Sequence, residues 1–307
     1  INGGTFNASN GGYGIAALTN GNVVINGGTF NNALLNWGGS ISIKGGTFKA
    51  KPDASYLADG YKAIAADGLY YVVAEEVDAV VTTATEAMSA IKVENQTIIL
   101  APAENGGQHL MGGKMSLASG VSLIGLGNEP VAVFNDWGSN AFANQAHFTN
   151  TTVENISFTN NLVIDAGIAN GDVHFKNCVF GGDRAHQGVH FDSGNATIVF
   201  DGCTFVGRNM FGASLTKVIF NDCTFLNKKS SLTGADKWTG VNMWGKYEFN
   251  NCVFDTEATC NVKTDSVEAT FTNCKYTDNR NIEEVVNNYA GYPATIIIDG
   301  ELLPTPV

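Results

Sequence analysis

A six-residue pattern recurs along the chain and constrains its fold more than any other feature. Each unit opens on an apolar residue, carries Asn, Asp or Gly at its third position and a small or apolar residue, often cysteine, at its fourth, and closes on an aromatic residue. Units begin at Ile1, Ile25, Ile43, Val153, Phe175, Phe200, Phe220, Phe249 and Phe271. From Phe158 to Tyr276 the closing residues are 22, 25, 20, 29 and 22 residues apart. A period in the twenties is typical of a solenoid.

The unit is too short for two helices, so the repeat predicts short strands joined by tight turns. The composition agrees, because only 15% of residues are charged and 36 of 307 are glycine. We therefore expect an all-β chain folded as a right-handed parallel β-helix, with short capping helices. In such a stack equivalent side chains of successive coils lie about 4.8 Å apart and form ladders.

Two ladders follow from the register of the repeat. One runs through the fourth position of each unit and the other through its closing aromatic residue. The expected members are Cys178, Cys203, Cys223, Cys252 and Cys274, with Phe180, Phe205, Phe225, Phe254 and Tyr276. A disulfide framework would not repeat one position in every coil, and a straight row of thiols does not converge on a metal ion. We expect buried free thiols there, with Cys260 outside the pattern.

The chain divides into two runs of coils. Residues 1–75 hold the Gly-Gly-Thr-Phe units and look like the end of a longer repeat region, whereas residues 76–83 read as a connector. Thr83-Ala-Thr-Glu86 is a capping-box pattern that opens a short helix at the start of a capped β-helix over 84–307. This second run is a separate β-helix or the first one resumed. A short helix near Asn281 and a hairpin around Asp299-Gly300 would close its far end.

Charge and hydropathy exclude several partners. A formal charge of −12 argues against nucleic acid and anionic membrane surfaces, which require clustered Lys and Arg. No apolar run reaches the roughly 20 residues of a membrane span. We expect neither nucleic-acid binding nor membrane insertion.

The polar residues of one loop and strand form the densest candidate site. They are Asp183, Arg184, His186, His190 and Asp192, and they have the carboxylates, imidazoles and cation used in sugar chemistry. Because His190 and Asp192 alternate with apolar neighbours, the simpler interpretation is a solvent-facing strand. Trp238 and Trp244, with Tyr247 and Trp137, either stack on sugar rings or pack against the coil. No catalytic set, cofactor or metal site is predicted.

These patterns resemble two groups of proteins. The Gly-Gly-Thr-Phe units with Tyr56-Leu-Ala-Asp-Gly-Tyr61 resemble repetitive β-helix regions of bacterial cell-surface proteins. The helix, strand and Ser119-Gly-Val-Ser-Leu-Ile-Gly125 pattern, with the later Asn-Cys-Thr-Phe coils, resembles the pectate-lyase-like β-helix superfamily. That superfamily includes polysaccharide lyases, glycoside hydrolases, adhesins and trimeric phage tailspikes, so the resemblance implies architecture more than activity.

The resemblance implies two classes of function. The first is a non-catalytic extracellular rod, a phage tail fibre, spike or head fibre or a bacterial surface adhesin, that contacts cell-surface glycans. Such rods are often homotrimers, or assemble with other virion or cell-surface proteins. A row of free thiols suits folding in a reducing cytosol, which favours the virion. The alternative is a polysaccharide lyase or glycoside hydrolase on the same fold.

Overall fold

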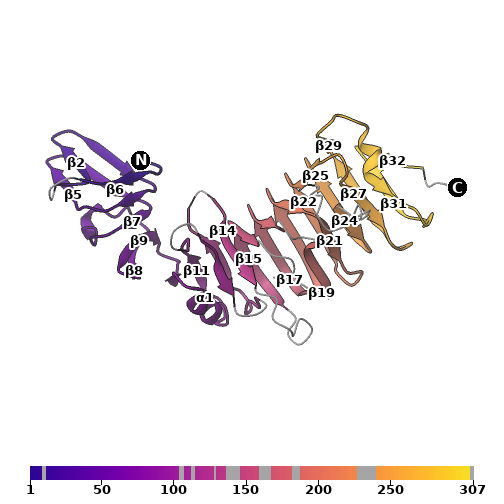
Figure 1. The fold of residues 1–307 in the computed structure, drawn as a ribbon, viewed down its shortest axis with the longest axis horizontal. Coiled ribbons are helices and arrows are strands. Elements are labelled where there is room, and N and C mark those ends of the chain that lie inside the picture. Colours follow the sequence, from indigo (N-terminus) through magenta and orange to yellow (C-terminus); the bar gives the residue numbers. More distant parts are fainter. Residues whose placement is uncertain are drawn as a thin grey trace.

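A computed structural model describes residues 1–8, 12–103, 107–111, 115–127, 129–135, 146–158, 167–181, 187–226 and 240–304. It shows an all-β chain wound into a solenoid of about 11 turns, which confirms the predicted fold class. The coils lie in two consecutive stacks along an elongated molecule, with the termini at opposite ends (Figure 1).

The first stack has three sides of parallel strands and ends in a hairpin. β1 (Thr5–Phe6), β4 (Thr29–Phe30) and β7 (Gly46–Phe48) form one side, β2 (Ile15–Leu18) and β5 (Leu34–Trp37) a second, and β3 (Asn22–Ile25) and β6 (Ser40–Ile43) a third. The short helix η1 (Ala54–Tyr56) follows. β8 (Tyr61–Ala66) and β9 (Leu69–Ala74) then pair antiparallel, and β9 runs antiparallel to β7. Parallel growth of this sheet therefore ends at β7.

A small apolar cluster joins the two stacks. Tyr71 and Val73 of β9 pack with Val80 of β10 (Ala79–Val81) and with Ile99 of β11 (Thr97–Leu100). β10 already pairs in parallel with β11, so it is the first strand of the second stack. It lies inside the stretch 76–83 that was expected to be a connector. The second stack is a separate set of sheets and not a continuation of the first.

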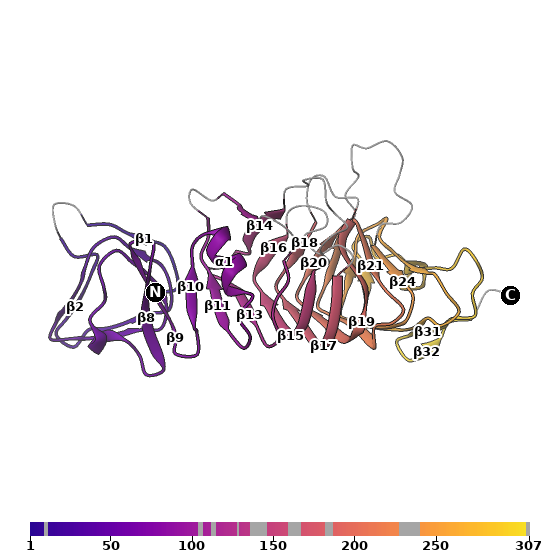
Figure 2. The ribbon, with the colours of Figure 1, turned by 90° about the horizontal axis from the view of Figure 1, so that it is seen from below.

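The second stack opens with the helix α1 (Ala84–Ala90) over its first coils (Figure 2). Thr83 Oγ1 accepts a hydrogen bond from the Glu86 backbone N–H, and the Glu86 carboxylate accepts from the backbone N–H of Thr83. Ala87 and Ile91 are buried in the main core. The helix thus covers apolar side chains at the end of the stack, as the capping-box pattern predicted.

The coils of the second stack have two or three sides, and each side is a sheet of parallel strands. The first side comprises β10, β11, β13 (Ser122–Gly125), β15 (His147–Glu154), β17 (Gly167–Lys176), β19 (Gln187–Asp201), β22 (Lys217–Asn221), β25 (Lys246–Asn250), β28 (Glu268–Thr272) and β31 (Thr295–Ile298). The second comprises β12 (His109–Met111), β14 (Val131–Asn135), β16 (Ile156–Phe158), β18 (Val179–Phe180), β20 (Thr204–Val206), β23 (Thr224–Leu226), β26 (Val253–Phe254) and β29 (Lys275–Tyr276). The third comprises β21 (Arg208–Phe211), β24 (Gly240–Met243), β27 (Thr259–Val262) and β30 (Val286–Asn287), and the beginning of β19 pairs with β21.

The third position of the repeat is a left-handed bend between the first two sides. Positive φ angles of 49° to 62° occur at Asn155, Asn177, Gly202, Asp222, Asn251 and Asn273, the third residue of six successive units. Asn, Asp and Gly tolerate this conformation better than other residues. The repeat therefore carries Asn, Asp or Gly there because the corner of the coil requires it.

Aromatic rings fill the core in two parallel ladders. The closing residues Phe158, Phe180, Phe205, Phe225 and Phe254 stack with ring centroids 4.8–5.1 Å apart. A second ladder runs through Phe175, Phe200, Phe220, Phe249 and Phe271 and meets the first edge-on. Tyr276 closes the first ladder with its ring tilted and its hydroxyl donating to the Ala258 carbonyl at 3.1 Å.

The cysteines of the repeat lie side by side on successive coils as free thiols. Each Sγ donates to the carbonyl of the opening residue of the preceding unit, as Cys203 does to Phe175 and Cys223 to Phe200, at 3.3–3.5 Å along the row. All are buried except Cys274, which is partly exposed, and Cys260 is a further buried free thiol. Burial raises the pKa of Cys178 and Cys260.

The C-terminal end is closed by a helix and a hairpin. The short helix η3 (Ile282–Val285) has Asn281 as its N-cap, with the side chain accepting from the Glu283 N–H. β31 and β32 (Glu301–Leu302) pair antiparallel around Asp299-Gly300, where both residues have positive φ. Antiparallel pairing at this edge ends the parallel ladder of the first side.

Candidate functional site

The outer surface of the third side of the second stack gathers the described candidate residues. We call it the β24 face and define it by His190, Asp192, Arg208, Met210, Trp244 and Lys263, together with Asn242 and Asn261, which are almost fully buried among them. Side chains alternate along these strands. Asn209 and Phe211 of β21 are buried inside, whereas Arg208 and Met210 between them face outward and are half-buried.

The register of the strands turns this alternation into rows across the coils. His190 aligns with Met210, Met210 with Asn242, Asn242 with Asn261, and Asn261 with Asn287. Arg208 aligns with Gly240 and then with Thr259. Because each coil adds about 4.8 Å, these rows run along the axis of the stack.

A third row lies just beyond the strand ends. Phe211 pairs with Met243, and the Lys263 backbone N–H donates to the Met243 carbonyl at 3.0 Å, so Trp244 and Lys263 follow at equivalent places. Asp192 follows Phe191, which pairs with Phe211. The third row therefore carries an acid, a glycine, an aromatic ring and a base on four successive coils: Asp192, Gly212, Trp244 and Lys263.

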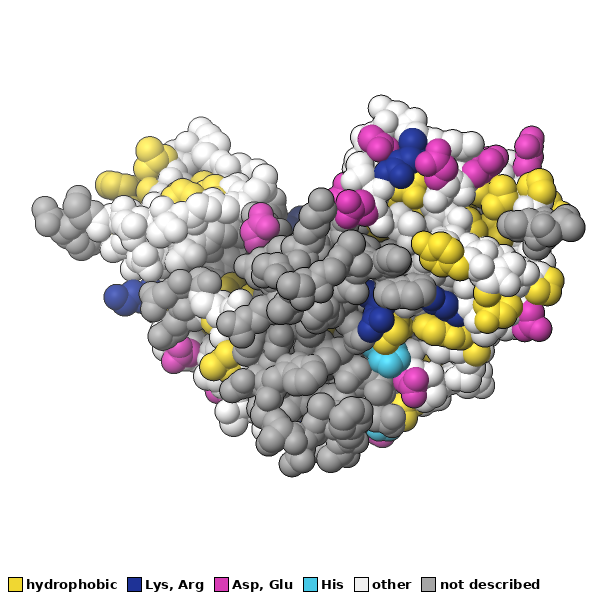
Figure 3. Space-filling model, turned by 45° about the vertical axis from the view of Figure 1, so that its right-hand side comes forward, with side chains coloured by type: hydrophobic (Ala, Val, Ile, Leu, Met, Phe, Trp, Pro, Cys, Tyr) yellow, Lys and Arg dark blue, Asp and Glu magenta, His cyan; other side chains and the backbone are white. Residues whose placement is uncertain are grey.

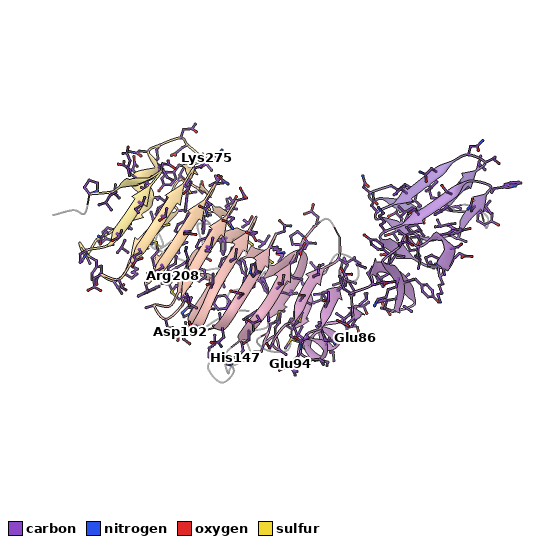
Figure 4. The ribbon with its side chains drawn as sticks, turned by 180° about the vertical axis from the view of Figure 1, so that it is seen from behind. Glu86, Glu94, His147, Asp192, Arg208 and Lys275 are labelled. Carbon is purple, nitrogen blue, oxygen red and sulfur yellow. The ribbon has the colours of Figure 1, made fainter. Side chains whose placement is uncertain are left out.

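Basic and aromatic groups thus meet polar ones on this face. Figure 3 shows Lys and Arg, His, Asp or Glu, and hydrophobic side chains gathered on one side of this half of the molecule. Asp192 and Arg208 lie on the paired strands β19 and β21 (Figure 4), with Arg208 at the start of β21 and Asp192 beside its end. His190 Nε2 is 3.6 Å from Asp192 Oδ1, and the Asp192 side chain is more than half exposed.

A chain of amides in the middle row is incomplete. Asn287 Nδ2 donates to Asn261 Oδ1 at 2.9 Å, but within the described part of the chain Asn261 Nδ2 and Asn242 Oδ1 have no hydrogen-bond partner. Both residues are almost fully buried, at 1% and 3% exposed. Leaving such atoms unpaired costs free energy, and at this burial neither atom is open to solvent.

Arg208 and Lys263 place positive charge beside these amides. The Arg208 Nε atom is buried and likewise has no hydrogen-bond partner among the residues that the structure describes. Partial burial of Lys263, with the nearby charge of Arg208, lowers the pKa of its ammonium. Next to Arg208 stands Gly240, where a Cβ would lie 2.0 Å from the Thr259 carbonyl oxygen. Only glycine fits there, and no side chain separates Arg208 from the following coil.

The structure brings together part of the predicted site. His190, Asp192 and Trp244 share the β24 face, whereas Tyr247 is buried, with its hydroxyl donating to the Phe211 carbonyl and accepting from the Trp244 N–H. Tyr247 therefore packs in the coil, the simpler of its two interpretations. Asp183, Arg184, His186, Trp238 and Trp137 lie outside the described residues.

Five residues of the face were missed by reading the sequence, Met210 and four polar ones. Arg208, Asn242, Asn261 and Lys263 belong to coils of unequal length, so their separations of 34, 19 and 2 residues show no period. The signal that would have found them is a short strand between one closing aromatic and the next unit, as in Asn209-Met-Phe211 and Val241-Asn-Met243. Their pairing depended on loop lengths that the repeat does not specify.

Two further properties bear on the chemistry of the described chain. Within it, no group of three or more His, Cys, Asp or Glu side chains is placed to hold a metal ion. The helices of those same ranges include none with the length and hydropathy needed to cross a membrane.

Comparison with protein-family models, with curated proteins and with solved structures found no match to this chain.

Proposed function

We propose that this protein is a non-catalytic extracellular rod that contacts cell-surface glycans through the β24 face. The rod is a component of a phage virion appendage or a bacterial surface adhesin. The observation that carries the proposal is the row with Asp192, Trp244 and Lys263, in which an aromatic residue follows an acid by two coils and precedes a base by one.

The arrangement suits an extended polymer. From Asp192 to Lys263 the row covers four coils, so it is about 15 Å long at about 4.8 Å a coil. A flat aromatic ring offers a surface for the apolar face of a sugar, and polar groups on either side fix its orientation. A glycan running along the axis would meet several coils at once.

Binding explains the face better than hydrolysis does. Glycoside hydrolysis uses two carboxyl groups about 5–10 Å apart. Within the described part of the three rows, Asp192 is the single carboxylate, and its neighbours are an imidazole and a thioether. The competing proposal of a lyase or glycoside hydrolase therefore draws less support from this face.

A glycan array with a cleavage assay tests the proposal. We expect the chain to bind bacterial surface polysaccharides without releasing reducing ends or unsaturated products. Trp244→Ala should weaken binding at least tenfold, because stacking of a flat ligand on an aromatic ring contributes on the order of 1–3 kcal/mol. Trp37→Ala is the matched control, since Trp37 is 71% exposed on the first stack and should leave affinity unchanged.

The result can contradict the proposal in two ways. Binding to no glycan at all, or equal affinity of the Trp244→Ala and wild-type chains, would exclude the β24 face as a glycan site. Release of reducing ends or unsaturated products would favour the alternative, a lyase or glycoside hydrolase. Thermal unfolding of both variants verifies that each keeps its fold.

A second experiment separates the two kinds of rod. Mass spectrometry of intact purified phage particles should detect the chain if it is a virion component. Its presence on washed bacterial cells and its absence from every particle would favour the adhesin.

A further inference from the structure

We propose that Cys252 and Cys274 form an oxidation site, at which a hydroperoxide makes a disulfide between the last two coils of the cysteine row. The row is the set of repeat cysteines that the structure holds as free thiols, Cys178, Cys203, Cys223, Cys252 and Cys274. The site lies at the C-terminal end of the second stack. It is independent of glycan binding at the β24 face, so either proposal can fail without the other.

The first argument is the distance between the two cysteines. They precede Val253 and Lys275, which are partners in the pairing of β26 with β29, and the Lys275 backbone N–H donates to the Cys252 carbonyl at 3.0 Å. Neighbouring strands lie about 4.8 Å apart, within the Cα separations of about 4.4–6.8 Å that disulfides span. Each Sγ also donates to the carbonyl of the opening residue of the preceding unit, so the two side chains point the same way. A disulfide requires rotation of these side chains and only a small approach of the two backbones.

The second argument is access to one end of the row. β29 is the last strand of the second side in the described chain, so no further strand of that sheet covers Cys274. Cys274 is partly exposed, whereas the other four thiols of the row are buried. Lys275, the next residue, is exposed at the C-terminal end of the stack (Figure 4). A small oxidant can therefore reach this end of the row and not its middle.

The third argument is the hydrogen bond between the two thiols. Hydrogen bonds from the Cys223 and Cys274 thiols lower the pKa of Cys252, and the contact with Cys252 raises the pKa of Cys274, its donor. Two thiols that interact in this way lose their first proton as a pair. Transfer of a proton along the hydrogen bond moves the negative charge to Cys274, the partly exposed member. The thiolate, which is the reactive form of cysteine, is thus available where the oxidant arrives.

The reaction proceeds in two steps. The Cys274 thiolate attacks one oxygen of hydrogen peroxide and the O–O bond breaks, which leaves a sulfenic acid on Cys274 and, after proton transfer, releases water. The Cys252 thiol then attacks the Cys274 sulfur, the S–S bond forms, the S–O bond breaks, and a second water leaves. Two thiols are oxidised to one disulfide while one peroxide is reduced to two waters. Only Cys274 has to meet the oxidant, so the buried Cys252 reacts without being open to solvent.

The disulfide would fasten the last coil of the row to the one before it. Its cost within the fold is the loss of two weak S–H donors, those that reach the carbonyls of Phe220 and Phe249. Cys252 and Cys274 are 22 residues apart in sequence, so the cross-link restricts the unfolded chain over that loop. Terminal coils of a solenoid have a neighbour on one side only, and the cross-link adds a covalent one.

Oxidation of the folded full chain by hydrogen peroxide tests the inference. After timed exposure the remaining thiols are blocked with N-ethylmaleimide in denaturant, and non-reducing peptide mapping by mass spectrometry locates each disulfide. We expect a disulfide between Cys252 and Cys274 as the first product. The pair Cys178 and Cys203 is an internal control, because it occupies adjacent coils in the same register but both residues are buried, so it should stay reduced.

Substitutions then assign the reaction to these residues. Cys274→Ser removes the partly exposed thiol and should abolish disulfide formation in the row. Cys252→Ala removes the second thiol and should leave Cys274 as a sulfenic acid, which dimedone labels. Cys260→Ala is the matched control, since Cys260 is a buried thiol outside the row and its loss should leave the disulfide unchanged. Thermal unfolding shows which variants are folded, and Cys274→Ser with Cys260→Ala suffice if Cys252→Ala is not.

Hydrogen exchange measures the consequence of the cross-link. In the oxidised chain the amides of β28 and β29 should exchange more slowly than in the reduced chain, and addition of a dithiol reductant should restore the original rates.

Four results would overturn the inference. They are a folded chain that peroxide leaves fully reduced, oxidation of Cys178 and Cys203 as fast as of the end pair, an undiminished disulfide in Cys274→Ser, and disulfides between two copies through Cys274 in place of the internal one. None of them bears on the glycan array, which tests the proposed function separately.

Discussion

At the scale of single residues, the backbone conformation at the corners of the coil accounts for much of the repeat. Asn155, Asn177 and their equivalents turn left-handed, and each is followed by an inward-pointing cysteine or apolar residue. The cysteine at this position packs as a small apolar group and its thiol also donates to a carbonyl of the preceding coil. Such a residue fills the corner without leaving its polar atom unpaired.

Gly240 makes a residue-scale prediction. Its φ is +104°, and the Thr259 carbonyl oxygen is only 2.0 Å from where a Cβ would lie, so a side chain has no room. Gly240→Ala should lower the free energy of unfolding by roughly 3 kcal/mol, from backbone strain and steric overlap together. Gly291→Ala is the control, because Gly291 has φ +65° and open space around its Cβ, so it should cost about 1 kcal/mol. Urea unfolding measures both, and equal losses would contradict the account.

At the scale of elements, the helix α1 shows how a local signal acts in a tertiary setting. Its capping box was readable from Thr83 and Glu86, but a helix of seven residues has little stability alone. Packing of Ala87 and Ile91 on the first coils supplies the rest. The helix and the end of the stack therefore stabilise each other.

Glu86 makes this element sensitive to pH. Hydrogen bonds from the Thr82 backbone N–H, and then from Thr83, hold the pKa of the Glu86 carboxyl below its ordinary value. A depressed folded-state pKa stabilises the fold above the unfolded-state value, and this contribution is lost as pH falls through the folded-state value. We expect Glu86→Gln to be less stable than wild type at about pH 6, and the difference to shrink towards about pH 3.

Thermal unfolding at several pH values measures this difference. Glu94→Gln is the control, since Glu94 is exposed beyond the helix and takes no part in the capping box. A stability difference between Glu86→Gln and wild type that stays constant across the same pH range would count against a carboxylate-dependent cap.

At the scale of the whole molecule, the two stacks have unequal cores. The first packs a small set of buried apolar residues around Phe30 and Phe48, whereas the second has one continuous core from Val81 to Ile298. The cluster of Tyr71, Val73 and Ile99 joins them. In a solenoid each coil contacts only its neighbours, so stability varies along the axis.

This difference predicts unequal opening of the two stacks. By native-state hydrogen exchange with mass spectrometry, the backbone amides of β2 to β7 should exchange faster than those of β19 to β28, because less apolar surface protects them. Tyr71→Ala should increase exchange in β8 and β9 and leave β22 to β28 unchanged. Uniform exchange over all these strands would show that the stacks unfold as one unit.

The sequence predicted the solenoid, its rows of closing aromatics and cysteines, and both capping elements. Each of these depends on local backbone geometry or on one periodic position. The sequence did not predict the β24 face. His190 and Asp192 stood out as a local cluster, but Arg208, Asn242 and Lys263 join them only because loops of unequal length bring four coils into one register. Likewise β10 joins the second stack through pairing with β11. Local conformation depends on residues that are neighbours in the sequence. The composition of a face depends instead on which coils become adjacent, and this adjacency is established only when the chain has folded.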